Sequence, residues 1–583
     1  MSERPQTASP SIYRTVPVNE CSLRVMTGHD RIAAEILENV RGRSKALVVC
    51  EGFVGARWDV WRERLSASFR ACGIEPAWFD CSGALKDADA EHDAILQFHL
   101  TDEPVFGRIY RGKIGDFFDA QKMSDLAGSA RQTPGISIIY GPGASLAAGA
   151  GDCLVYLDVS KEEFQNRCRG KSTTSFACRE ARPLGEMYKR AFYIDWPVLN
   201  LEKRRLLPSL DLLVDETDPL LPKACHGVSF RKALAQVAGA PVRVKPFFLP
   251  GPWGGQWMKE NFELPSGPPN YAWSYELIAP ENGILVGTEQ EWMEVSFDYL
   301  LWQEADAVMG PAVTSVFGSA FPIRFDYLDT VGGTNLSCQI HPRVDYIRDE
   351  FGEPFTQHET YYVMQAELGA RVYLGLREDI DPAAFRKAAE GAEREGTPFE
   401  IGDHVHSIPS SAHDLFLIPA GTVHCSGAGN LVLEISATPY IYTFKIYDYL
   451  RKDLTGQLRQ VFVDRAFANI DFTRRAPWVN DHLKPAPRLI REDAGAAEYV
   501  IADLPQLFFR IHRLEFEHQI SDACNGRFLV LNLVAGERVE ILHGSRRTEL
   551  RYAETIIVPA SVGEFQVVNK GQGSCKLVKA LIR

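Results

Sequence analysis

The sequence lacks several features that mark specialised classes of protein. No stretch approaches the roughly 18 apolar residues of a transmembrane helix, and the first 20 residues lack a basic patch followed by an apolar run. The 12 cysteines are scattered singly, as at Cys21, Cys50 and Cys72, and none forms a C-x-x-C pair. We therefore expect no disulfide framework, no membrane partner and a location in a reducing cytoplasm.

An excess of positive charge is also missing. The formal net charge is -13, which argues against nucleic acid or anionic membranes as partners and favours a small molecule. Hydrophobic residues make up 45% and charged residues 24%, as in ordinary globular proteins. A length of 583 residues exceeds what one core usually organises, so two or three domains are expected. Nothing in the composition sets the oligomeric state.

Strand-like and helix-like segments alternate in the first part of the chain. Apolar runs at 45–53, 136–143 and 153–160 end in turn residues and are typical of buried strands. The segment 58–73 has apolar residues at helical spacing. This alternation predicts a parallel α/β sheet.

The composition of the chain changes near residue 240, because the segment 241–257 is rich in proline, glycine and aromatic residues. From 328 to 436, short strand-like pieces between glycine and proline turns predict an antiparallel barrel or jelly roll. The segments 288–310 and 381–396 are predicted to be helical, the latter as an insertion in the β-rich part. The predicted parts are an N-terminal extension (1–40), an α/β domain (41–240), a metal-binding β domain (241–475) and a smaller second β domain (476–583).

Four polar residues in the third part have the chemistry of metal ligands. Gln339 and His341 alternate with apolar neighbours, so a strand would direct both onto one face. Glu359 begins the next strand-like run, and His424 lies in a proline and glycine turn. Two imidazoles, a carboxylate and an amide oxygen suit a catalytic zinc ion, although iron, manganese or cobalt also accept such ligands.

The same region resembles class I mannose-6-phosphate isomerases, which are cupins. LSCQIHP, HETYYV, FLIPAGTVHCSGAGNLVLEIS and IYTFKIYDY follow the order of that family's motifs, and KPFFLPGPWGGQW is similar to its opening strand. The resemblance covers most of residues 241–455, and the tail is similar to the family's second barrel. It implies a cupin fold with one zinc ion bound by Gln339, His341, Glu359 and His424.

Three departures from the family pattern fall near the substrate. Lys445 stands where an arginine is expected, and Gln357 and Asp326 stand where lysines are expected. Such cations handle the charge of a phosphate or an enediolate, and lysine lacks the bidentate fork of arginine. Phosphate recognition is therefore the part of the resemblance that these residues weaken.

The resemblance implies an aldose–ketose isomerase, with mannose 6-phosphate and fructose 6-phosphate as the default pair. The reaction needs a base that moves a proton between C1 and C2, for which Glu434 and, as an alternative, His358 are candidates. Lys445 is the candidate for stabilising the oxyanion that forms. A noncatalytic sugar or sugar-phosphate sensor, and an isomerase of a different sugar, remain open.

Residues 41–240 resemble, more faintly, a degenerate P-loop kinase of the uridine-kinase type. The segment from Ile136 to Gly170 has a strand, a glycine-rich turn, a second strand ending in Asp158 and an arginine-bearing helix in the expected order. The phosphate-binding motif itself is missing, because EGFVGARWDVW stands where GxxxxGK[ST] is expected. In the second β domain, VPASVGEF (558–565) has no histidine in its turn, so no metal is expected there.

Overall fold

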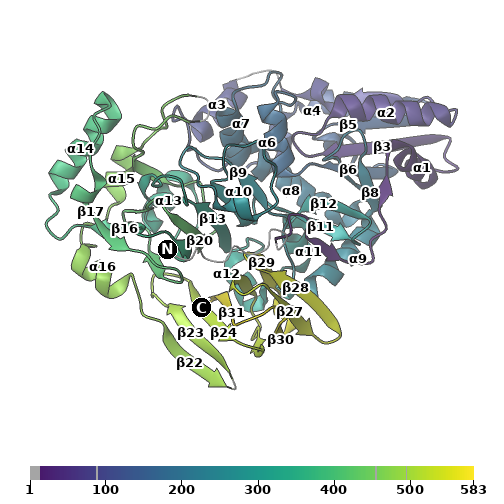
Figure 1. The fold of residues 1–583 in the computed structure, drawn as a ribbon. Coiled ribbons are helices and arrows are strands. Elements are labelled where there is room, and N and C mark those ends of the chain that lie inside the picture. Colours follow the sequence, from purple (N-terminus) through teal and green to yellow (C-terminus); the bar gives the residue numbers. More distant parts are fainter. Residues whose placement is uncertain (1–12, 87–89, 454–455, 494) are drawn as a thin grey trace. The chain divides into compact units, whose positions relative to one another are not determined.

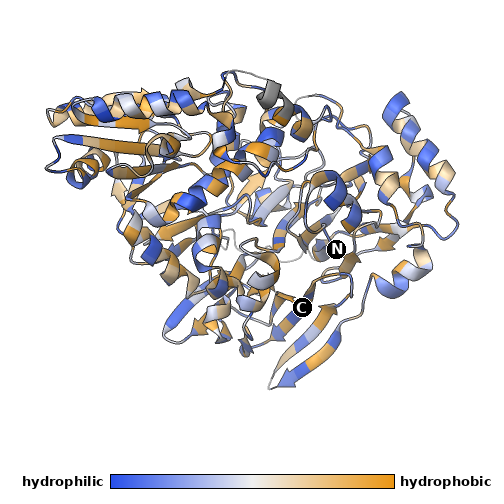
Figure 2. Cartoon of the chain, turned by 180° about the vertical axis from the view of Figure 1, so that it is seen from behind, coloured by the Kyte–Doolittle hydropathy of each residue, from blue (hydrophilic) through white to orange (hydrophobic). Residues whose placement is uncertain are grey.

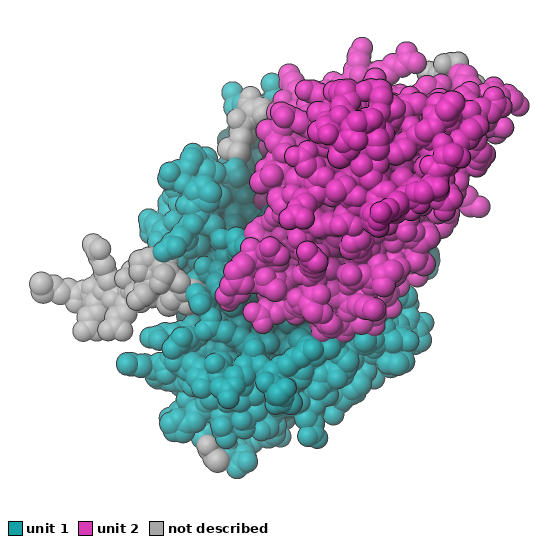
Figure 3. All heavy atoms as spheres, turned by 90° about the vertical axis from the view of Figure 1, so that its right-hand side faces the viewer, with its two compact units in different colours: residues 1–17, 238–280, 305–583 teal, residues 18–237, 281–304 magenta. Residues whose placement is uncertain are grey.

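The computed structural model describes residues 13–86, 90–453, 456–493 and 495–583. The chain divides into two compact units, which Figure 3 distinguishes by colour. Unit 1 contains Met1–Pro17, Ala238–Pro280 and Ala305–Arg583, and unit 2 contains Val18–Val237 and Glu281–Glu304.

These units differ from the predicted parts in two places. Most of the predicted N-terminal extension belongs to unit 2, since strands and a helix between Val18 and Asn39 join its sheets and core. The segment Glu281–Glu304 also belongs to unit 2, although it follows the predicted boundary at 240. Both β domains predicted after that boundary lie in unit 1.

Unit 2 is built on a seven-stranded sheet with the order β2-β8-β7-β6-β3-β5-β4. Neighbours from β7 to β4 are parallel, whereas β8 and β2 are antiparallel. The strands are β2 (Met26–Thr27), β3 (Lys45–Gly52), β4 (Ala77–Asp80), β5 (Gly135–Tyr140), β6 (Cys153–Asp158), β7 (Leu212–Asp215) and β8 (Lys223–His226). The central strands read as continuous apolar runs because helices cover both faces of a parallel sheet.

One face of this sheet packs against α1 and α2 around Val48, Cys50 and Val155. Figure 2 shows these strands as mainly hydrophobic, whereas the helices alternate along their length. The helices of the unit are α1 (His29–Asn39), α2 (Trp58–Ala71), α3 (Ala90–Leu100), α4 (Ala120–Gln132), α5 (Ala144–Ala148), α6 (Lys161–Arg169), α7 (Leu184–Arg190), α8 (Trp196–Leu206) and α9 (Gly227–Ala238), with short turns η1 (Cys81–Ala84) and η2 (Ile114–Phe117). The α/β class predicted for this region agrees with the structure, whereas its likeness to P-loop kinases stays a prediction.

A second, three-stranded sheet explains why the segment Glu281–Glu304 belongs to unit 2. Its order is β1-β11-β12, with β1 (Val18–Glu20), β11 (Gly283–Gly287) and β12 (Trp292–Ser296). The prediction that 288–310 is helical is wrong for its first part, because Trp292–Ser296 pairs with β11 in an antiparallel hairpin. Only α11 (Asp298–Met309) is helical there.

Unit 1 begins with a barrel of two sheets, ordered β18-β15-β20-β13-β10-β9 and β17-β16-β19-β14-β21. Their strands are β9 (Phe247–Leu249), β10 (Trp273–Leu277), β13 (Ile323–Asp329), β14 (Cys338–Ile340), β15 (Glu359–Ala366), β16 (Arg371–Leu376), β17 (Val405–Pro409), β18 (Leu415–Ile418), β19 (His424–Ser426), β20 (Asn430–Ala437) and β21 (Phe444–Tyr447). The pairing of neighbouring strands is antiparallel, as the alternating pattern predicts.

Short helices accompany this barrel: α10 (Trp257–Asn261), α12 (Pro311–Phe317), α13 (Val344–Phe351), α14 (Pro382–Glu395), α15 (Val463–Asn469) and α16 (Ala476–His482). The helical insertion predicted for 381–396 is α14 (Figure 1). Asp381 caps its N-terminus by accepting the N–H of Ala383, and Gly396 ends it with a left-handed backbone.

The tail of unit 1 forms a second pair of sheets around a separate apolar core. Their orders are β22-β23-β24-β31-β26-β29 and β25-β30-β27-β28. The strands are β22 (Arg488–Asp493), β23 (Ala496–Ala502), β24 (Phe509–Phe516), β25 (Gln519–Ala523), β26 (Leu529–Ala535), β27 (Arg538–His543), β28 (Arg546–Arg551), β29 (Thr555–Val558), β30 (Glu564–Asn569) and β31 (Cys575–Ile582). In the part of the chain that the structure describes, no helix is long and apolar enough to cross a membrane.

A buried ion pair joins α8 to the sheet of unit 2. Lys203 Nζ lies 2.6 Å from Asp158 Oδ1, and the Lys203 side chain is 1% exposed. The ammonium also lies 3.9 Å from the centre of the Phe53 ring. Removing one partner of such a pair leaves a charge in an apolar interior.

We expect Lys203→Ala to lower the free energy of unfolding by about 3–5 kcal/mol, because the Asp158 carboxylate loses its buried partner. Urea-induced unfolding followed by circular dichroism measures the change. The control is Arg41→Ala, because Arg41 pairs with Glu38 on the surface and should cost only about 0–1 kcal/mol. Equal costs for the two variants would contradict the assigned role of the pair.

Candidate metal centre

Three polar side chains form a row across the five-stranded sheet of the first barrel. Gln339 on β14 pairs with His424 on β19 and with Lys445 on β21. Paired residues of antiparallel strands direct their side chains to the same face. Gln339 Nε2 accordingly lies 3.3 Å from His424 Nε2.

The six-stranded sheet carries a matching set of charged residues. Glu359 on β15 and Arg324 on β13 both pair with Ser436 on β20, and Glu434 pairs with Asp326 two residues along the same strands. Because the offset is two residues, both sets lie on one face of the sheet. The barrel thus places three carboxyl groups and one guanidinium on that face.

Glu359 joins the two sheets at the centre of the site. Its Oε2 lies 2.5 Å from His341 Nε2 and 3.3 Å from His424 Nε2. His341, Glu359 and His424 are all buried and offer ligand atoms within 4.8 Å of one another. They form the candidate metal group among the residues that the structure describes.

The two imidazoles are oriented by backbone carbonyl groups. His341 Nδ1 donates to Tyr442 O at 3.2 Å, and His424 Nδ1 donates to Thr422 O at 2.9 Å. Since a carbonyl can only accept, the proton of each neutral ring lies on Nδ1 and the lone pair on Nε2 faces Glu359. This is the tautomer that a metal ligand requires.

Glu359 gives an independent test of whether the residues fit a metal. Its Oε1 is buried and lacks a hydrogen-bond partner in the described part of the chain. A buried carboxylate with one oxygen unpaired, and with the Nε2 atoms of two imidazoles beside the other oxygen, fits a divalent cation.

The charges around Glu359 also favour a bound cation. Burial raises the pKa of Asp326 to about 6 and that of Glu434 well above its ordinary value, although the Arg324 guanidinium opposes both shifts. Arg324 forms ion pairs with Asp326 and Glu434, which leaves the Glu359 carboxylate beside the two imidazoles. A divalent cation at Glu359 would compensate its charge.

Arg324 is a residue that sequence reasoning missed. It lies two positions before Asp326 on β13, so it presents a cation to the face on which a lysine was expected at 326. The amide group of Gln357 contacts Arg324 and Glu434, and it also approaches His341 Nε2 to 3.2 Å. The two departures at 326 and 357 therefore lie in one contact network with Glu434. The alternation of IRFD along the strand was the available signal.

Lys445 lies at the edge of the site in a second charged cluster. Its Nζ is 3.9 Å from Asp448 Oδ2, and Asp448 also binds Arg451 at 2.6 Å and Arg459 at 2.8 Å. Burial lowers the pKa of Lys445 to about 8, and Arg459 lowers it further than Asp448 restores it. The ammonium is thus one of three cations around a single carboxylate.

His358 is turned toward the backbone. Its Nδ1 accepts the N–H of Ala420 at 3.2 Å, and burial, with Arg474 nearby, lowers its pKa to about 4. Because that nitrogen is engaged, His358 is a weaker candidate for the proton-transfer base than Glu434.

Comparisons with known proteins give different results for the two parts of the chain. A family model described as a domain of unknown function (DUF8485) matches residues 28–239. The C-terminal part is similar to the mannose-6-phosphate isomerase of Streptococcus mutans, at 25% identity over 319 residues, which are 54% of this chain and 90% of that protein. It is also similar to the probable mannose-6-phosphate isomerase GmuF of Bacillus subtilis, at 23% identity over 58% of this chain and 98% of that protein.

Solved structures of the same kind are similar to this part as well. The mannose 6-phosphate isomerase of Bacillus subtilis covers 58% of this chain with 99% of its own, at 19% identity and a TM-score of 0.47. A zinc-bound mannose 6-phosphate isomerase covers 59% of this chain with 100% of its own, at 13% identity and a TM-score of 0.45. Because the family model that matches residues 28–239 is one of unknown function, the likeness of this part to P-loop kinases stays a prediction.

We expect about one equivalent of divalent metal per chain, lost in His341→Ala and in His424→Ala, because each variant removes one Nε2 ligand atom. Elemental analysis of chelator-free protein measures the metal content. His406→Ala is the matched control, since His406 is bonded to Asn480 away from the three residues. Retention of stoichiometric metal by either site variant would contradict the ligand assignment.

Proposed function

We propose that unit 1 is a metal-dependent aldose–ketose isomerase of a sugar phosphate, with mannose 6-phosphate and fructose 6-phosphate as the substrate pair. Gln339, His341, Glu359 and His424 hold the metal, which is zinc in this proposal. The observation that carries the proposal is the buried group of His341, Glu359 and His424, with both Nε2 atoms directed at Glu359. The similarity to mannose-6-phosphate isomerases along 90% or more of their length supports the reaction class.

A zinc ion at this site would polarise the oxygens on C1 and C2 of the sugar. Glu434 would take the proton from C2 of the aldose and deliver it to C1 of the enediol, while the hydroxyl proton on O2 moves to O1, which gives the ketose. Burial raises the pKa of Glu434 well above its ordinary value, and the Arg324 guanidinium opposes that shift. Arg324 keeps the carboxylate oriented through its direct contact with Glu434.

Lys445 stabilises the negative charge that develops on the sugar oxygen. It pairs with Gln339 across β21 and β14, so its ammonium and the proposed ligand amide share one face of the sheet. A preorganised cation in a partly dry site lowers the barrier without exchanging a proton itself.

A noncatalytic sugar sensor is the second candidate. The observation in its favour is that Asp326 and Gln357 occupy positions where the resembled family has lysines, and Arg324 is already bound to two carboxylates. In that case the metal site binds a sugar phosphate and leaves its C–H bonds intact.

The zinc-loaded full chain should convert mannose 6-phosphate to fructose 6-phosphate, and treatment with a chelator should abolish conversion. A coupled dehydrogenase assay follows the product. Glu434→Gln should keep its zinc, because Glu434 is not a proposed ligand, and should lower kcat by about 10²–10⁴, because an amide cannot take up the proton. Absence of turnover from folded, zinc-loaded protein that still binds the sugar phosphate would favour the sensor.

The activity should fall as the pH rises through about 8, because Lys445 loses its proton there. A lysine whose pKa is lowered keeps its charge below that pH and loses it above. Lys445→Arg should extend activity to higher pH, since arginine stays protonated. The measurement is kcat against pH for both proteins, and an identical alkaline limb in both would exclude Lys445 as its source.

A further inference from the structure

Unit 2 has a cavity at the point where the order of its parallel strands reverses. After β3 the chain passes through α2 to β4, which lies beyond β5 at one edge of the sheet. After the neighbouring β5 it passes through α5 to β6, which lies beyond β3 in the opposite direction. In open α/β sheets, ligands bind in the crevice outside the carboxyl ends of such strands. A cavity of about 260 Å³ lies there, at the ends of β3, β4 and β5.

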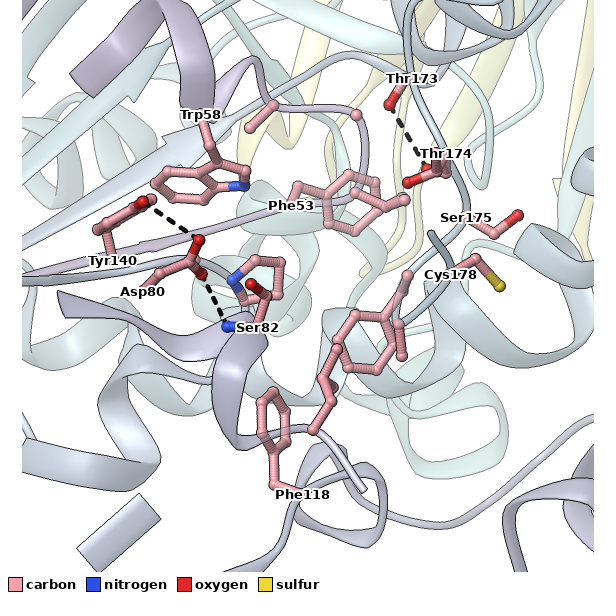
Figure 4. Close-up of a pocket in the computed structure, with 18 residues that line it drawn as sticks. Phe53, Trp58, Asp80, Ser82, Phe118, Tyr140, Thr173, Thr174, Ser175 and Cys178 are labelled. Carbon is pink, nitrogen blue, oxygen red and sulfur yellow. Dashed lines mark hydrogen bonds between the residues drawn. The ribbon is translucent and has the colours of Figure 1, made fainter. Parts of the chain in front are cut away.

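The cavity wall combines aromatic faces with oxygen atoms, as Figure 4 shows. Its aromatic residues include Trp58, Phe118, Tyr140 and Phe176. Its oxygen atoms include those of Asp80, Ser82, Thr173 and Thr174. Asp80 Oδ1 accepts the N–H of Ser82 at 2.7 Å, and Asp80 Oδ2 accepts the Tyr140 hydroxyl at 3.2 Å, which fixes the carboxylate at the end of β4.

The loop 173–178, which lines one side of the cavity, is held by hydrogen bonds to two buried charged residues outside the cavity lining. The N–H of Phe176 donates to Asp195 Oδ2 at 3.0 Å, and its carbonyl accepts from Arg190 at 2.6 Å. Arg190 and Asp195 are themselves a buried ion pair at 3.1 Å. The wall is therefore held in place before any ligand arrives, which lowers the entropy cost of binding.

The charges around the cavity disfavour a phosphate. No lysine, arginine or histidine is among the described residues that line it, and Arg62, which contacts the hydroxyl of Tyr140, is not part of that lining. The backbone N–H groups after β5, which a phosphate could use, are already taken. Glu51 accepts those of Gly143 at 2.7 Å and Ser145 at 3.0 Å, so the protein's own carboxylate occupies the anion position.

The remaining chemistry suits a small neutral polyol. Carboxylate and carbonyl oxygens accept hydrogen bonds from hydroxyl groups, threonine and serine hydroxyls donate and accept, and aromatic rings cover the apolar face of a sugar ring. The cavity volume of about 260 Å³ lies just below the range of drug-sized pockets, which suits a small ligand.

We propose that this cavity is a binding site for an unphosphorylated monosaccharide, with Asp80 and Thr174 as hydrogen-bonding residues and Trp58 as the stacking face. The site lies within unit 2, and the proposal does not depend on the isomerase function of unit 1.

Cys178 allows the site to be located in solution. It lines the cavity and is partly exposed, whereas Cys72 at the end of α2 is exposed and lies outside the lining. The full chain carrying His424→Ala is treated with N-ethylmaleimide, and peptide mass spectrometry gives the modification rate of each cysteine. The His424→Ala background prevents the metal centre of unit 1 from contributing to sugar binding.

Saturating mannose, glucose or fructose should slow the modification of Cys178 about fivefold or more and leave that of Cys72 unchanged. Asp80→Asn should raise the sugar concentration needed for protection about tenfold, because a charge-assisted hydrogen bond is lost. Thr174→Val is a second variant that leaves the Asp80 contacts intact and should weaken protection in the same direction. The matched control is Asp125→Asn, since Asp125 is exposed on α4 and bonded to Gln121.

Two results would overturn the proposal. One is that none of the three hexoses protects Cys178 in folded protein. The other is that mannose 6-phosphate or uridine protects Cys178 at lower concentration than every free hexose, which would assign the cavity to a phosphorylated ligand or a nucleoside.

Discussion

The buried carboxylate of Glu359 is the constraint on which the first barrel depends. Glu359, Asp326 and Glu434 share one sheet face, and Arg324 forms ion pairs with Asp326 and Glu434. Burying an uncompensated carboxylate is costly, and a protein meets that cost by protonation, ion pairing or metal binding. The unpaired Oε1 of Glu359 and the inward Nε2 atoms of His341 and His424 favour the third solution. Metal binding, barrel stability and the working state of Glu434 are therefore linked through electrostatics.

Asp326 and Gln357 stand where the resembled isomerases have lysines, and their surroundings explain how this site can differ. Each difference, taken alone, weakens the case for a sugar-phosphate enzyme. In the structure, Arg324 supplies a cation two residues before Asp326 on β13, and the Gln357 amide oxygen accepts a hydrogen bond from Arg324 without adding charge. A guanidinium bound to two carboxylates differs from a free ammonium, because it orients Glu434 and is less available to a phosphate. A guanidinium that orients Glu434 supports the isomerase proposal, whereas weaker phosphate binding supports the sensor proposal.

The sequence predicted the parts of this architecture that depend on local pattern. Period-two alternation around Gln339 predicted a strand, and the helix-like segment 381–396 predicted α14. Long-range pairing was beyond such reasoning. β1 joins β11 across more than 260 residues, so the chain order could not assign Glu281–Glu304 to unit 2. The residues of β12 were predicted as helix, because their apolar spacing fits the period of a helix as well as that of a strand. Arg324 was missed for the same reason, since its partner Glu434 is 110 residues away. In unit 2, the sequence showed that the phosphate-binding motif is missing. It did not show that the Glu51 carboxylate binds the backbone N–H groups at the start of α5.

In the proposed reaction, Glu434 breaks and forms a carbon–hydrogen bond of the sugar beside the buried metal group. Hydrogen exchange at C1 and C2 of the sugar tests this step most directly, and proton NMR follows it with the zinc-loaded full chain, mannose 6-phosphate and D₂O. We predict deuterium in the sugar at a rate that falls to background with a chelator and in Glu434→Gln. Binding of the sugar phosphate without any deuterium incorporation would contradict it.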